Sequence, residues 1–133
     1  MKKDIIFPEV KGVMLAIARK SVDDYYQWHA YIINMNDHDL DHLLIVSKGY
    51  SAPGVSRQDT SILRHSIEVL KARSYAIIEP LDPAVFKLFN EFWVSYYYNK
   101  QMYDKRFIFT PGSVSEDHLV KIDALELEGI LHI

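Results

Sequence analysis

Cysteine is absent from the 133 residues of this chain. Its absence excludes a disulfide framework, a thiolate nucleophile and any zinc or iron–sulfur site that depends on cysteine ligands. Long apolar runs are missing too: the first one, Ile5–Phe7, is cut by Pro8 and Glu9 and is far shorter than the core of a signal peptide. No stretch approaches the roughly 20 apolar residues that span a bilayer. We therefore expect a cytoplasmic protein with no membrane partner.

Neither sign of charge dominates the chain. Lys and Arg together number 15, Asp and Glu number 18, and the formal net charge is −3. Proteins that bind nucleic acids usually carry a basic stripe or patch, whereas the basic residues here are dispersed along the sequence. We therefore expect no nucleic-acid partner.

The short motifs of several enzyme classes are also missing. The sequence has no G-x-S-x-G elbow of a serine hydrolase, no Gly-rich phosphate-binding loop and no H-E-x-x-H zinc motif. These absences favour a protein that is not an enzyme and that uses no cofactor.

Aromatic residues are abundant, with nine Tyr and six Phe, and such residues pack well on a pleated, half-buried surface. Short apolar or alternating segments bounded by turn residues predict about seven strands. The segment 60–70 fits a helix and a strand about equally well. We expect Tyr25–Asn34 and Leu43–Ser47 to pair as a hairpin with a longer loop. The strand segments are Val13–Ala18, Tyr25–Asn34, Leu43–Ser47, Tyr75–Glu79, Trp93–Tyr98, Tyr103–Phe109 and Leu125–Ile133.

The segment Asp82–Phe92 has the pattern of a helix. Asp82 is a good N-cap, and Pro83 sits at the first helical position, where its missing N–H costs nothing. Val85, Leu88, Phe89 and Phe92 then form an i, i+3, i+4, i+7 stripe. A second, short helical turn is expected after Ser113 or Ser115, with Glu116 and Asp117 near its start.

These segments predict an α+β fold. We expect a single domain over residues 1–133, with an antiparallel sheet of about seven strands and one or two helices packed on it. An all-β sandwich is the alternative.

The clearest element is the aromatic hairpin Trp93–Phe109. Asn99 and Lys100 predict a two-residue turn, since Asn tolerates positive φ. That turn pairs Tyr98 with Gln101, Tyr96 with Tyr103, Ser95 with Asp104, and Trp93 with Arg106, the last pair close enough for a cation–π contact.

Aromatic residues fall on both parities of the strand Trp93–Tyr98, so each of its faces needs cover. We therefore expect a protein that acts by protein binding or self-association, as a homodimer that makes contact through Trp93, Tyr97 and Tyr98. A binder of sugars or other small molecules, which would stack on exposed aromatic rings, is an alternative.

The segment Asn36–His42 is the densest group of potential metal ligands. Its D-x-D-x-D start resembles a calcium loop, but His42 stands where that loop needs Gly and Lys48 where it needs Glu. Asn and Asp are also common in solvated turns, which is our first interpretation. The alternative function is a small metal-dependent enzyme or metal-binding protein that uses Asp37, His38, Asp39 and His42.

Three charged residues stand among apolar neighbours: Arg64, Glu68 and Glu79. A buried charge needs a partner, so these residues predict an ion pair or the lining of a pocket, and the ion pair is our first interpretation. His65 is a candidate partner for Ser61 or Ser66.

Overall fold

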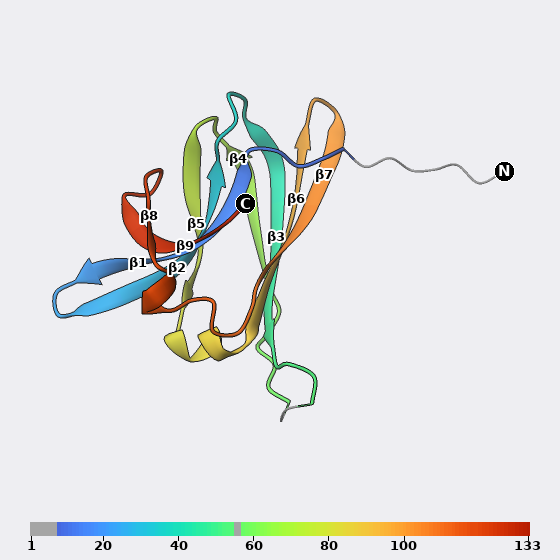
Figure 1. The fold of residues 1–133 in the computed structure, drawn as a ribbon. Coiled ribbons are helices and arrows are strands. Elements are labelled where there is room, and N and C mark those ends of the chain that lie inside the picture. Colours follow the sequence, from blue (N-terminus) through green and yellow to red (C-terminus); the bar gives the residue numbers. More distant parts are fainter. Residues whose placement is uncertain (1–7, 55–56) are drawn as a thin grey trace.

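The computed structural model describes residues 8–54 and 57–133, and the apolar run Ile5–Phe7 lies outside them. The described chain folds into two antiparallel sheets (Figure 1). One sheet has the order β5-β2-β1-β9-β8 and the other the order β4-β3-β6-β7. The strands are β1 Val13–Val22, β2 Tyr25–Asn34, β3 Leu40–Tyr50, β4 Leu63–Leu70, β5 Ser74–Leu81, β6 Phe89–Tyr98, β7 Gln101–Phe109, β8 Val120–Ile122 and β9 Leu127–His132.

The expectation of an α+β fold is wrong, and the all-β alternative fits the structure. Helical structure in the described ranges is limited to two short 3₁₀ segments, η1 Pro83–Lys87 and η2 Glu116–His118. No helix in these ranges is long and apolar enough to cross a membrane.

The predicted helix Asp82–Phe92 is also wrong, although its start is correct. Asp82 caps η1 by accepting a hydrogen bond from the backbone N of Ala84, at 2.9 Å. After Lys87 the chain enters β6, where Phe92 is buried and Trp93 is exposed. Strand pairing on both sides of β6 offers more backbone hydrogen bonds and more burial than an isolated helix of about ten residues.

The predicted hairpin is confirmed as the pair β6–β7. Asn99 and Lys100 form its turn, both at positive φ (51° and 63°), as a type I′ turn requires. The strand register matches the expected pairs from Tyr98–Gln101 to Trp93–Arg106.

The segment 60–70 resolves as strand β4. The predicted pairing of Tyr25–Asn34 with Leu43–Ser47 is wrong, because β2 pairs with β1 and β5 while β3 pairs with β4 and β6. The loop 35–39 therefore crosses from one sheet to the other instead of closing a hairpin.

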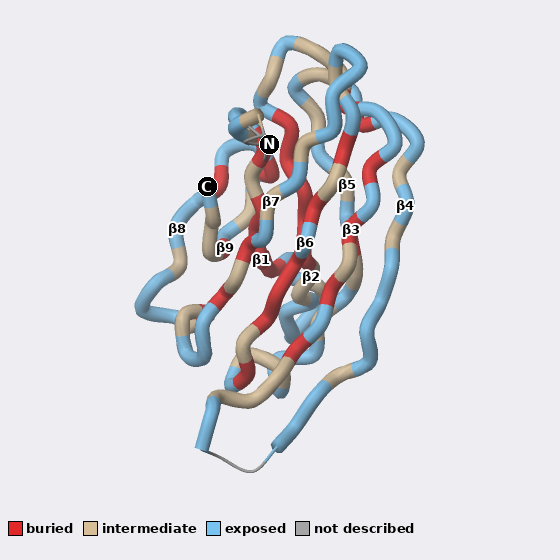
Figure 2. Tube along the Cα trace, turned by 90° about the vertical axis from the view of Figure 1, so that its right-hand side faces the viewer, coloured by how far each residue is buried: buried red, intermediate tan, exposed pale blue. Residues whose placement is uncertain are grey.

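The main core lies between the two sheets. It takes alternate residues of the central strands, such as Leu15, Ile32, Ile45 and Phe92, all of them 2% exposed or less. Burial is concentrated on the central strands, whereas β4 is mostly exposed (Figure 2). The sandwich is therefore less tightly closed along its edge strands β4 and β5 than at its centre, and we call this its open side.

Candidate functional site

The outer face of the β4-β3-β6-β7 sheet, the side that carries Trp93, is the first candidate site. Strand alternation sends Phe92, Val94 and Tyr96 into the core and leaves Trp93 and Tyr97 on this outer face. Large apolar side chains remain exposed there: Leu44 at 40%, Trp93 at 43%, Tyr97 at 45% and Met102 at 46%.

Charged residues flank this apolar strip. The guanidinium of Arg106 lies 5.1 Å from the centre of the Trp93 ring, which confirms the expected cation–π contact. Asp104 occupies the next outward position of β7, opposite Ser95. The outer face is therefore amphipathic, with both signs of charge on its β7 side.

A buried carboxylate lies at one end of the outer face. Glu91 is only 7% exposed, and the ammonium of Lys48 lies 3.7 Å from its Oε2. The Tyr50 hydroxyl donates to Glu91 Oε1 at 3.3 Å. Burial, with the Glu91 charge as the second cause, raises the pKa of Tyr50. Lys48 and Tyr50 belong to the same sheet as Glu91, so the Glu91 carboxylate has its partners within that sheet.

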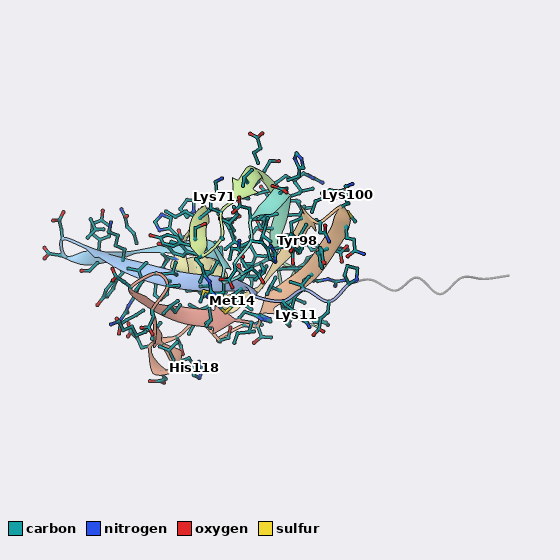
Figure 3. The ribbon with its side chains drawn as sticks, turned by 90° about the horizontal axis from the view of Figure 1, so that it is seen from above. Lys11, Met14, Lys71, Tyr98, Lys100 and His118 are labelled. Atoms are coloured by element: carbon teal, nitrogen blue, oxygen red, sulfur yellow. The ribbon has the colours of Figure 1, made fainter. Side chains whose placement is uncertain are left out.

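Tyr98 does not lie with the other two predicted contact residues. Its ring stacks on His38, with ring centres 3.5 Å apart and planes 14° apart. It lines a small pocket with Lys11, Tyr96 and Tyr103, and in the view of Figure 3 Tyr98 lies between Lys11 and Lys100. The structure therefore brings Trp93 and Tyr97 together on one face and separates Tyr98 from them.

The four predicted metal ligands each interact with a different partner. Asp37 pairs with Arg73 at 2.8 Å, and Asp39 accepts a hydrogen bond from the backbone N of Ala72, also at 2.8 Å. That backbone hydrogen bond is the main cause that lowers the pKa of Asp39. The two aspartates thus connect the β2–β3 loop to the β4–β5 turn.

The two histidines of this group face aromatic rings, His38 on Tyr98 and His42 edge-on to Tyr97 at 6.3 Å. Within residues 8–54 and 57–133, no three His, Asp or Glu side chains are arranged to hold a metal ion. A metal role for Asp37, His38, Asp39 and His42 stays a prediction.

A second candidate site lies inside the sandwich, on its open side. Glu79 Oε1 accepts a hydrogen bond from Ser47 Oγ at 2.5 Å, and His65 Nε2 lies 2.9 Å from the same oxygen. A β-bulge at Ile78 turns Glu79 inward, opposite Ala30. The three polar residues come from β3, β4 and β5, so the site joins the two sheets.

Only part of this interior group can be predicted from the sequence. The sequence predicts an ion pair or a pocket lining for Glu79, but for His65 it offers only the nearby serines as partners. Ser47 carried no signal at all. The structure pairs His65 with Glu79 rather than with Ser61 or Ser66.

Comparison of the chain with protein-family models, with curated proteins and with solved structures finds no match. The class that the fold and these two sites define is a two-sheet, all-β protein with an amphipathic outer face and an interior cleft that holds the carboxylate of Glu79.

Proposed function

We propose that this protein is a non-catalytic binding protein that self-associates as a homodimer through the outer face. The observation that carries the proposal is the strip of four exposed, large apolar side chains on that face: Leu44, Trp93, Tyr97 and Met102. Contiguous exposed apolar surface on a globular protein commonly marks an interaction site. Aromatic residues, Met and Arg are also enriched at interfaces.

The strand register supports a two-fold arrangement of two such faces. Val46, Trp93 and Arg106 form one row across the sheet. Leu44, Ser95 and Asp104 form the next row. A two-fold axis that lies in the interface, crosses the strands and passes between these rows places each row against the other row of the second copy.

This axis makes the face complementary to itself. Arg106 of each copy lies opposite Asp104 of the other, and Val46 lies opposite Leu44. One row further out, Ile108 lies opposite Met102. The strands of the two facing sheets then run nearly parallel to one another, which is the aligned mode of sheet packing. An axis parallel to the strands would instead place Arg106 opposite Arg64, so charge favours the first arrangement.

The test is a charge exchange measured by analytical ultracentrifugation over a range of concentrations. Arg106→Asp and Asp104→Arg each place like charges opposite one another across the axis, so each single variant should weaken dimerisation at least about tenfold. The double variant, which restores opposite charges, should recover most of the affinity. Lys121→Asp makes the same charge change as Arg106→Asp, on β8 in the other sheet, and should leave dimerisation unchanged.

A wild-type protein that is monomeric at every concentration would overturn the proposal. Single variants that dimerise as well as Lys121→Asp would overturn the two-fold arrangement. A cytoplasmic location and the lack of a nucleic-acid partner belong to this proposal as expectations.

A further inference from the structure

We propose that the interior cleft binds a small organic cation, with an amine or amidine head against Glu79 and an apolar body along the cleft. The cleft is a cavity of about 320 Å³ between the two sheets, which is within the usual range for small-molecule sites. It lies on the opposite side of β3 and β6 from the outer face, so the inference stands apart from the proposed dimer.

The anchor is the carboxylate of Glu79. Its side chain is only 10% exposed, and both Ser47 and His65 contact the same oxygen, Oε1. Within the part of the chain that the structure describes, no group donates to the other oxygen, Oε2. Arg19 Nε and His29 Nδ1 are the only fully buried side-chain polar atoms without a partner in the described residues, so Oε2 is accessible to solvent. Because Glu79 lines the cleft, a ligand there that donates to Oε2 makes a charge-assisted hydrogen bond.

The charge around the anchor favours a cation. The two groups that contact Oε1 are a hydroxyl and an imidazole, and neither is a permanent cation as Lys or Arg is. Asp82 adds a second carboxylate to the cleft lining. Lys48 also lines the cleft, but its ammonium lies 3.7 Å from Glu91 Oε2 on the outer face. The basic group nearest the cleft is therefore already paired elsewhere.

The remaining walls suit an apolar body. Leu63, Leu81, Val85 and Phe92 line the cleft beside Glu79. Apolar walls with a few convergent polar groups are typical of small-molecule sites. A single flat ring with a cationic head would place its ring between these side chains and its head at Oε2.

The test compares three probes of one shape: benzamidine, the neutral benzamide and the anionic benzoate. Binding to the wild-type protein is followed by methyl NMR of its Leu and Val residues at about pH 8, where histidine is ordinarily neutral. Benzamidine should shift the methyl signals of Leu63, Leu81 and Val85, and it should bind at least about tenfold more tightly than benzamide. Benzoate should shift none of them.

Glu79→Gln keeps the shape of the side chain and removes its charge. This variant should weaken benzamidine binding about tenfold to a hundredfold and abolish its preference over benzamide. Glu68→Gln, at an exposed position of β4, is the matched control and should bind as the wild type does.

The three-probe comparison uses the wild-type protein, so it decides the inference even if Glu79→Gln fails to fold. Equal binding of the three probes, preference for benzoate, no shift with benzamidine, or shifts confined to methyl groups outside the cleft would each overturn it. A monomeric protein that binds benzamidine in this way would refute the dimer and leave this inference intact.

Discussion

Asn34 ends β2 with a fully buried side chain that joins three segments of the chain. Its Oδ1 accepts a hydrogen bond from the backbone N of Asn36 at 3.0 Å. We predict that Asn34→Asp, which preserves the shape, strongly destabilises the protein near neutral pH. The amide Nδ2 donates to the carbonyl oxygens of His38 (2.9 Å), Leu70 (3.2 Å) and Lys71 (3.1 Å).

The magnitude follows from what the substitution removes. The carboxylate has no hydrogen to donate, so the carbonyl oxygens of His38, Leu70 and Lys71 each lose the Asn34 donor and face a negative charge instead. The Lys71 oxygen keeps a donor in the Ser74 hydroxyl, at 2.7 Å. Each buried group left unsatisfied costs about 1–3 kcal/mol, and a buried charge without a partner costs about 3–5 kcal/mol. We therefore expect the free energy of unfolding to fall by about 4 kcal/mol or more, a large share of the 5–15 kcal/mol typical of a domain.

The sign of the pH dependence provides a second readout. Burial among carbonyl oxygens raises the pKa of the introduced carboxyl in the folded state above its value in the unfolded state. The folded variant therefore binds a proton more tightly, and its deficit relative to wild type should shrink as the pH falls through that raised pKa. The protonated carboxyl can also donate one hydrogen bond to the facing carbonyls.

The assay is urea unfolding followed by tryptophan fluorescence at about pH 8 and about pH 5, with unchanged m-values as the check on two-state behaviour. Asn99→Asp makes the same chemical change at an exposed turn position and should shift stability by less than about 0.5 kcal/mol. An Asn34→Asp protein within about 1 kcal/mol of wild type at the higher pH would refute the reasoning. So would a deficit that does not shrink at the lower pH.

Three further predictions concern single positions. Gly129→Ala should lower the free energy of unfolding by about 1–3 kcal/mol in the same urea assay, because a Cβ there would contact the backbone oxygen of Ile17 on the paired strand; an unchanged midpoint would contradict this. Burial raises the pKa of Tyr96 to about 12, so its contribution to stability is present below about pH 10 and lost as the pH rises through that folded value. Tyr96→Phe should remove both this loss and the latest phase of the tyrosine absorbance titration, and a titration identical to that of wild type would count against it. The backbone hydrogen bond from Ala72 is the main cause that lowers the pKa of Asp39. The contribution of Asp39 to folding stability is therefore present above the ordinary Asp pKa and is lost as the pH falls through the folded value. A carboxyl NMR titration in which Asp39 titrates at the ordinary pKa would disprove this.

Features set by neighbouring residues could be predicted from the sequence. The β6–β7 turn needs two residues that adopt positive φ, and once Asn99 and Lys100 are chosen, the register of the whole hairpin follows. The Asp82 cap is likewise local, since its side chain reaches only two residues ahead. Both predictions are confirmed.

Features set by distant partners could not be predicted in the same way. The stripe from Val85 to Phe92 fits a helix, but β3 and β7 pair with β6 on both sides and continue the strand as far back as Phe89. The β2–β3 loop looks like a hairpin connection, yet each strand pairs within a different sheet. Nothing within these short segments encodes the partner strand.

The interior cleft shows the same limit for a site. Ser47, His65 and Glu79 lie on three strands and two sheets, so no spacing in the sequence connects them. The inward position of Glu79 depends in addition on the β-bulge at Ile78, and a one-residue irregularity of this kind changes the parity on which a strand prediction rests.

The aromatic residues of β6 lie in two environments, according to the face of the sheet on which they stand. Phe92, Val94 and Tyr96 face the core, where β1, β2 and β9 cover them, whereas Trp93 and Tyr97 lie on the outer face and stay 43% and 45% exposed. The same alternation applies to β3, where Ser47 faces the cleft and Lys48 the outer face.

Neighbouring residues on these strands therefore face different candidate sites. The residues changed in the two tests nevertheless lie apart, with Asp104 and Arg106 on β7 and Glu79 on β5. Because β7 contributes no residue to the cleft lining, loss of dimerisation in the charge-exchange variants with cation binding retained would show that the two sites act independently.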